Sequence, residues 1–249
     1  MQKPLEYETK GPITYITLNR PKSNALDRES AEYLLECLKI AKTDSQCQGL
    51  VLTGSGRFFS TGFDLKSIDL DRPETSVANL RDVANPLVQT LYSFPKPTVA
   101  VVNGDCAGLG MMMALACDTV YAASNVKFHM TFRKIGLEPA CGATHIVPER
   151  VGASVAEQYF DDTISLPSIS ALDAGLIESV GSYTMLMESA ARAALYISDG
   201  RSEQATAKKA MRDPDALQAA MDLEVELNAM AFASDKFRHA VEFIRACRR

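Results

Sequence analysis

The sequence predicts an α/β protein with one compact core. Short runs rich in β-branched and aliphatic residues alternate with longer segments in which apolar residues recur every three or four positions. Residues 185–249 contain no strand-like run. Alternating strands and helices are typical of α/β proteins, and the last segment adds a helical region.

Three runs, residues 13–18, 50–53 and 98–102, are predicted as buried or half-buried strands because each is bounded by Gly, Pro or Asn. Asp27 is expected to cap the first helix, whose apolar residues between positions 31 and 38 share one face. Residues 76–93 repeat this pattern. Pro86 should kink or restart that helix, because its ring removes an N–H group and clashes one turn back.

The C-terminal region is predicted to be helical. The expected helices cover residues 185–198, 216–233 and 235–247. Phe237, Val241 and Ile244 fall on one stripe of the last helix, and such a stripe must pack either on its own core or on another subunit. Since no Pro-, Gly- or Ser-rich linker intervenes, residues 1–184 and 185–249 are interpreted as the core and the helical region of one folding unit.

Composition excludes several classes of function. A chain of 249 residues, 47% hydrophobic, can bury a sizeable core, and its net charge of -5 argues against nucleic acid and membrane-surface partners. The N-terminus has no apolar run behind a basic start, so we expect no secretory signal, no membrane span and a cytoplasmic location. The six cysteines lack CxxC spacing and are expected to be buried thiols. No metal site and no Ser-His-Asp site is expected, because HExxH and GxSxG are both absent.

Two glycine-containing segments, residues 55–65 and 103–118, each follow a predicted strand and lead into a helix. Backbone N–H groups point outward at such junctions and attract negative charge. A dinucleotide-binding loop is disfavoured because Gly108-Leu-Gly lacks the third glycine of GxGxxG, and no GK[ST] loop is present. Taken singly, either segment is also explained by a tight packing turn.

Together these segments resemble the crotonase (enoyl-CoA hydratase/isomerase) superfamily over residues 10–180. The matching motifs are Arg20-Pro-Lys-Ser-Asn-Ala-Leu26, Gly-Arg-Phe-Phe-Ser-Thr-Gly-Phe-Asp-Leu65, Val102-Asn-Gly-Asp-Cys-Ala-Gly-Leu-Gly and Ala116-Cys-Asp. The resemblance implies a spiral of ββα units with a C-terminal helical trimerisation region, assembled as a homotrimer or hexamer. It also implies an acyl-CoA thioester as partner, with coenzyme A as part of the substrate and no separate cofactor.

By resemblance, the backbone N–H groups of Phe63 and Leu109 bind the thioester oxygen and hold the enolate formed from it. One such donor is typically worth about 3 kcal/mol in the transition state. The implied substrate-binding residues are Lys22, Ser23, Ala25, Leu26, Ser60, Thr61, Gly62, Asp64, Leu65, Gly108, Met112, Phe132 and Ala140.

The acid/base residues of the family are missing. The chain looks closest to the 3-enoyl to 2-enoyl-CoA isomerase branch, whose acid follows the position of Pro139, but Ala140 stands there. The two hydratase glutamates correspond to Met112 and Phe132, and none of these side chains can transfer a proton. Glu138 is the best candidate for a replacement base, the alternative being a solvated loop carboxylate.

Other polar residues near these motifs are interpreted as structural. His129 and His145 are expected to be structural rather than catalytic, and Asp64 and Asp118 to fix turns and caps. Three functions remain open: an enoyl-CoA isomerase or hydratase, a decarboxylase in which loss of CO₂ itself generates the enolate, and a non-catalytic acyl-CoA-binding protein.

Overall fold

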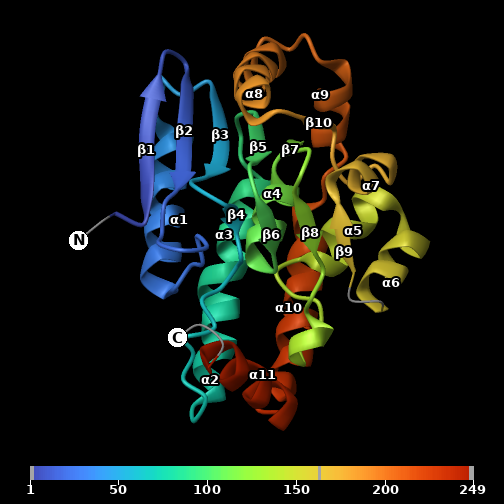
Figure 1. Ribbon diagram of the computed structural model, residues 1–249. Helices are drawn as coiled ribbons and strands as arrows, with labels where there is room; N and C mark the ends of the chain where they lie inside the picture. The colour runs from blue at the N-terminus through green and yellow to red at the C-terminus, as the bar shows by residue number, and fades with distance from the viewer. Residues whose placement is uncertain (1–2, 162–163, 247–249) are drawn as a thin grey trace.

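The computed structural model describes residues 3–161 and 164–246 and shows two mixed β-sheets with helices around them (Figure 1). The larger sheet has the order β1-β2-β3-β5-β7-β10. Its strands are β1 (Leu5–Lys10), β2 (Ile13–Leu18), β3 (Gly49–Gly54), β5 (Thr98–Val102), β7 (Thr119–Ala123) and β10 (Ser179–Gly181). Only the β1–β2 pair is antiparallel. All residues of β3 and β5 are buried, which explains their nearly unbroken apolar sequences.

A smaller sheet has the order β4-β6-β8-β9. Its strands are β4 (Phe58–Ser60), β6 (Asp105–Ala107), β8 (Lys127–His129) and β9 (Ser165–Pro167). The first three are parallel, and each directly follows a strand of the larger sheet in the chain. Because β4, β6 and β8 are parallel, their carboxyl ends meet at one edge, where loops of a parallel sheet form ligand sites.

Helices follow each pair of strands, which gives the predicted succession of ββα units. They are α1 (Arg28–Thr43), α2 (Pro73–Asn79), a π-helical turn η1 (Leu80–Ala84), α3 (Asn85–Tyr92), α4 (Leu109–Ala116), a 3₁₀ turn η2 (Arg133–Ile135), α5 (Ala143–Val151), α6 (Ala153–Asp161), α7 (Ser168–Asp173), α8 (Tyr183–Ser198), α9 (Glu203–Ala210), α10 (Pro214–Phe232) and α11 (Asp235–Ala246). Every residue of α4 is buried in the main core. Helix α8 packs on the opposite face of the larger sheet, in a second apolar cluster.

Most of the predicted elements are confirmed. The strands at 13–18 and 98–102 have the expected ends, and the one at 50–53 is longer by one residue on each side. The carboxylate of Asp27 accepts a hydrogen bond from the Ser30 backbone nitrogen at 2.9 Å and caps α1. Pro86 is the second residue of α3, directly after the π-helical turn, so the helix restarts there as expected.

The C-terminal helices also form as expected, except that α9 was not predicted. Phe237 and Val241 of α11 are fully buried in the main core, so the stripe of the last helix packs on its own chain. Cys247, the expected last residue of that helix, lies outside the described residues. The other five cysteines are free and buried, as predicted. Within the described part of the chain, no helix is both long and apolar enough to cross a membrane.

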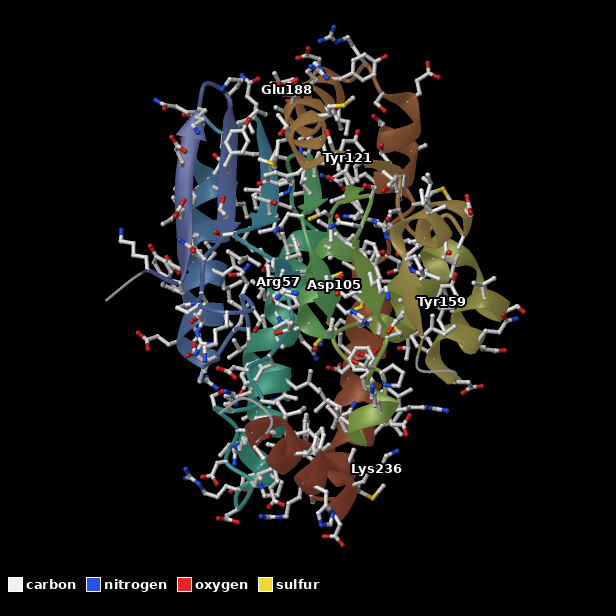
Figure 2. All side chains as sticks on the ribbon, viewed as in Figure 1. Arg57, Asp105, Tyr121, Tyr159, Glu188 and Lys236 are labelled. Carbon is white, nitrogen blue, oxygen red and sulfur yellow. The ribbon has the colours of Figure 1, made fainter. Side chains whose placement is uncertain are left out.

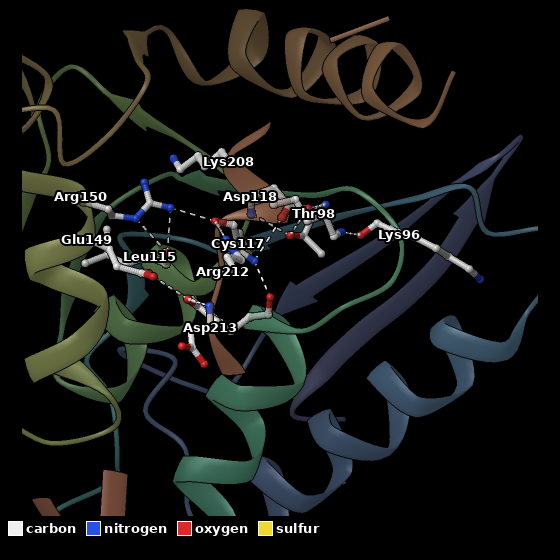
Figure 3. A network of polar contacts seen from close by, with 12 residues as sticks. Lys96, Thr98, Leu115, Cys117, Asp118, Glu149, Arg150, Lys208, Arg212 and Asp213 are labelled. Carbon is white, nitrogen blue, oxygen red and sulfur yellow. Dashed lines mark hydrogen bonds and ion pairs between the residues drawn. The ribbon is translucent and has the colours of Figure 1, made fainter. Parts of the chain in front are cut away.

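A buried polar network fastens the C-terminal region to the core (Figure 3). The Arg150 guanidinium donates hydrogen bonds to the carbonyl oxygens of Leu115 and Cys117 at 2.8 Å each. Arg212, between α9 and α10, donates to the same Cys117 carbonyl at 2.9 Å and forms an ion pair with Asp118 at 3.1 Å. Asp118 is therefore a scaffold residue, as expected from the sequence.

Candidate active site

A cavity of about 430 Å³ lies at the edge where the carboxyl ends of β4, β6 and β8 meet. One side of it is formed by the loops that follow these strands. The other side comes from α2, η1, α10 and α11, which contribute mainly apolar residues such as Leu80, Phe232 and Phe243. A concave, mostly apolar pocket with a few polar groups is the usual form of a small-molecule site.

Phe63 and Leu109, the two expected N–H donors, both line this wall. A β-bridge between Leu26 and Phe63 fixes the segment around Phe63. The backbone N–H of Leu26 donates to the Gly62 carbonyl and the backbone N–H of Asp64 donates to the Leu26 carbonyl, both at 2.8 Å. The Phe63 N–H lies between these two bonds and takes part in neither. Leu109 is the first residue of α4, where N–H groups have no partner within the helix. Neither N–H group donates to another group of the described residues.

Glycine at position 62 allows the two segments to meet. Its φ is +85°, and a Cβ atom there would lie 2.8 Å from the Ala107 carbonyl oxygen and 3.0 Å from the Leu109 nitrogen. The first distance is too short for a Cβ contact, the second is very tight, and both neighbouring atoms are backbone. Gly108, with φ +50°, turns the chain from β6 into α4 and so orients the Leu109 N–H group.

The structure brings most of the expected site residues together. The cavity is lined by Phe63 and Leu109 and, among the expected substrate-binding residues, by Ala25, Thr61, Asp64, Leu65, Gly108, Phe132 and Ala140. Six others do not line it: Lys22, Ser23, Leu26, Ser60, Gly62 and Met112. Lys22 is exposed at the surface, whereas Met112 is fully buried among other side chains.

Asp64 lines the cavity but is held by Arg20. The Arg20 guanidinium donates to the Asp64 carboxylate at 2.8 Å, to Asp27 at 2.7 Å and to the Ala25 carbonyl at 2.9 Å. Burial by itself raises the pKa of Asp27, but hydrogen bonds from Ser30 and the charge of Arg20 outweigh it and lower the pKa below its ordinary value. This cluster ties the 20–27 segment to the Phe63 segment, and Asp64 takes part in it while also lining the cavity.

Glu138 does not line the cavity. Its carboxylate is 43% exposed and lies 3.5 Å from the Arg133 guanidinium, and its backbone nitrogen donates to Asn228 at 3.1 Å. Ala140, two residues further on, does line the cavity. The loop therefore directs the small side chain inward and the carboxylate toward the surface.

The next turn of this loop is held by a buried carboxylate of α10. Glu224 accepts hydrogen bonds from the Gly142 and Thr144 backbone nitrogens at 2.7 and 2.8 Å, and burial raises the pKa of this carboxyl. Cys141, directly before Gly142, has φ +63° and lines the cavity. Burial, and then the nearby Glu224, raise the pKa of the Cys141 thiol well above its usual value, so it remains protonated.

Sequence reasoning missed a polar pair in the cavity wall. Asp105 lies on β6 near the centre of the molecule (Figure 2), and its carboxylate is 3.4 Å from Nε2 of His129 on β8. The other ring nitrogen of His129 lies 2.7 Å from the Ser165 hydroxyl on β9. Asp105 and His129 both line the cavity. His129 was expected to be structural because it matches a family position that is not the base, and its position along the chain carries no sign of this cross-strand contact.

Helix α11 covers the end of the cavity remote from the strands. Arg238 donates to the Leu70 carbonyl at 2.6 Å, and Arg245 donates to the Lys66 carbonyl at 3.2 Å. Both acceptors belong to the loop that continues from the Phe63 segment. The two arginines thereby hold Phe243 of this helix over the cavity.

Comparison with known proteins agrees with this architecture. The sequence profile of the enoyl-CoA hydratase/isomerase family matches residues 8–244. A 1,2-epoxyphenylacetyl-CoA isomerase of Escherichia coli is 40% identical over 156 residues, which are 61% of this chain and 59% of that protein. A 2,3-dehydroadipyl-CoA hydratase of the same organism is 33% identical over 84% of this chain and 76% of its own length. The crystal structure of an enoyl-CoA hydratase from Mycobacterium avium subsp. paratuberculosis superimposes with a TM-score of 0.84 at 28% identity, covering 97% of this chain and 99% of that one, which confirms the predicted fold. The chain belongs to the enoyl-CoA hydratase/isomerase family.

Proposed function

We propose that this protein binds an acyl-CoA thioester, stabilises the enolate form of its acyl group and acts as an enoyl-CoA isomerase. The observation that carries the proposal is that Phe63 and Leu109 both line a mostly apolar cavity and that their backbone N–H groups donate to no other group in the described part of the chain. The named relatives, an isomerase and a hydratase of acyl-CoA compounds, support the substrate class.

The two N–H groups suit a charge that develops during reaction. When a proton leaves the carbon next to a thioester, negative charge moves to the thioester oxygen. Two donors held in place by the Leu26–Phe63 bridge and by the start of α4 need no rearrangement to receive it. Each donor of this kind is worth about 3 kcal/mol, or a factor of 10² to 10³ in rate.

Isomerisation is favoured over hydration by the residues of the cavity. Hydration adds water across the double bond and uses two acid/base groups, whereas isomerisation moves one proton from one carbon to another. Of the positions that match the hydratase glutamates, Met112 is buried away from the cavity and Phe132 offers an apolar ring. Neither position therefore supplies the acid/base group with which a hydratase activates water, which supports isomerisation over hydration.

The proposal is tested with matched 3-enoyl-CoA and 2-enoyl-CoA substrates of several chain lengths in D₂O. Purified protein should interconvert the two isomers and incorporate deuterium next to the thioester, as followed by mass spectrometry. Tight binding without interconversion or deuterium incorporation would contradict the proposal and favour a binding protein. Release of CO₂ from malonyl-type thioesters, with no isomerisation, would instead favour a decarboxylase.

A further inference from the structure

Ser76 of α2 lies in the wall of the cavity with a hydroxyl group that has no hydrogen-bond partner. The residue is only 4% exposed. Among the side chains that line the cavity in the described part of the chain, no other has a buried oxygen or nitrogen without a partner. A hydroxyl that is buried without a partner is unfavourable, so we expect Ser76 to find its partner in a bound molecule.

The helix itself does not explain this hydroxyl. Ser and Thr side chains in helices commonly donate to a backbone carbonyl three or four residues earlier. The neighbouring Thr75 does so, since its hydroxyl donates to the Arg72 carbonyl at 2.8 Å. Ser76 instead shares a helix face with Leu80 and Ala84, which follow at intervals of four residues and also line the cavity. Ser76 is thus the polar member of an otherwise apolar face.

Asn79 supplies a second donor close to Ser76. It follows three residues later, so the two side chains are neighbours on the helix surface, and both line the cavity. Arg28 donates to the Asn79 side-chain oxygen at 3.0 Å. Because a guanidinium can only donate, the bonded atom is the carbonyl oxygen of the amide, and the Asn79 Nδ2 group remains free to donate.

The wall that carries these donors faces the acyl part of a bound thioester. A cavity of about 430 Å³ is too small for a whole acyl-CoA, and the charged phosphates of coenzyme A favour contact with water. They therefore belong at the exposed rim, where Lys66 and Phe243 lie. Ser76, Leu80 and Ala84 are buried and lie across the cavity from the two backbone donors, so they face the acyl chain beyond the thioester.

We propose that Ser76 and Asn79 recognise an uncharged oxygen substituent, an oxo or hydroxyl group, on the acyl chain beyond the thioester. The inference rests on the acyl-CoA binding proposed above and names the substrate class as oxygenated acyl-CoA compounds. The Ser76 hydroxyl and the Asn79 amide donate to the substituent, while Leu80 and Ala84 contact the neighbouring methylene groups. A carboxylate is disfavoured there, because two neutral donors in an apolar wall do not offset the cost of burying a charge.

The test measures equilibrium binding of saturated acyl-CoA compounds of equal chain length. One is unsubstituted, and the others carry an oxo, hydroxyl or carboxyl group at successive carbons. An oxo or hydroxyl group at one position should lower Kd by about 3- to 10-fold relative to the plain chain. Ser76→Ala should abolish this preference. Thr75→Ala is the matched control and should keep it, because it removes an adjacent hydroxyl that does not line the cavity.

Denaturant unfolding gives a second readout. Ser76→Ala should unfold at the same or a higher denaturant concentration than wild type, because the hydroxyl has no partner to lose, whereas a lower midpoint would indicate a structural role and overturn the inference.

The inference is also overturned if no oxygen position improves binding, if a carboxylate binds most tightly, or if Ser76→Ala keeps the preference. These results are distinguishable from failure of the proposed function. A preference for oxygenated chains without isomerisation of a 3-enoyl-CoA would support this inference and contradict the isomerase. Isomerisation with equal binding of plain and oxygenated chains would overturn this inference alone, and absence of acyl-CoA binding would overturn both.

Discussion

Substitution of Gly62 by alanine tests the pair of N–H donors without removing any functional group. The added Cβ atom would meet the Ala107 carbonyl oxygen at 2.8 Å and the Leu109 nitrogen at 3.0 Å. Both atoms belong to the backbone, so relief requires the β6–α4 junction to move away from the Phe63 segment. The variant therefore changes the spacing of the two donors.

The size of the effect has two parts. A residue with a Cβ atom in the left-handed region costs roughly 1–2 kcal/mol, and overpacking adds about 1–3 kcal/mol. Displacement of one donor from the enolate oxygen removes about 3 kcal/mol of transition-state stabilisation, which lowers kcat by roughly 10² to 10³. Gly56→Ala is the matched control, because Gly56 has φ +75° and open space around its Cβ position.

The assay combines denaturant unfolding with the rate of deuterium incorporation into a 3-enoyl-CoA. Both variants should lose stability, Gly62→Ala more than Gly56→Ala, but only Gly62→Ala should lose the exchange rate. The reasoning is refuted if folded Gly62→Ala exchanges as fast as wild type, or if both variants lose rate equally.

Three further predictions concern stability and assembly. Asp27→Asn keeps the acceptor that caps α1 but loses the Arg20 ion pair, so the free energy of unfolding at pH 7 should fall by about 1 kcal/mol. The pKa of Asp27 in the folded protein is below its ordinary 3.8. Its contribution to the free energy of unfolding is therefore present above pH 3.8 and is lost as the pH falls through the lowered pKa. Asp27→Asn should not show this part of the acid-induced loss of stability. Glu224→Ala deprives the Gly142 and Thr144 nitrogens of their acceptor and should cost about 2–4 kcal/mol in chemical unfolding, with a wild-type result excluding this role. We propose that the exposed stripe of Leu223, Leu227 and Met230 on α10 packs in a homotrimer, so Leu227→Glu should shift sedimentation from trimer to monomer, and a monomeric wild type would contradict the proposal.

The larger sheet and the long helices could be predicted because their signals are local. The strand at 13–18 alternates in burial from Thr14 onward, β5 is apolar after Thr98, and Asp27 precedes an amphipathic helix. The strands of the smaller sheet that line the site are only three residues long, too short for a periodic pattern to emerge. They become strands because each continues from a strand of the larger sheet and pairs with the previous unit.

The candidate site was predictable to the extent that it depends on motifs. Phe63 and Leu109 lie in glycine-containing segments and were identified by the resemblance of these motifs to the family, although the bridge that fixes Phe63 comes from Leu26, far away in the sequence. The contact of Asp105 with His129 joins residues 24 positions apart through strand pairing, and its extension to Ser165 spans 36 more. No local pattern in the sequence predicts which residues of neighbouring strands pair. Likewise, the orientation of Glu138 depends on Arg133 and Asn228, the second of which lies on another helix.

The proposed use of main-chain amides as the carbonyl-binding groups has a consequence for how such a protein changes over time. An amide N–H is present at every position except proline, so substitutions at 63 and 109 leave the donors in place as long as the chain keeps its path. That path depends on Gly62, Gly108 and the Leu26–Phe63 bridge. The residues that transfer protons are free to be replaced one at a time around a constant anchor. A lineage can therefore lose one reaction and acquire another without passing through a form that no longer binds its substrate.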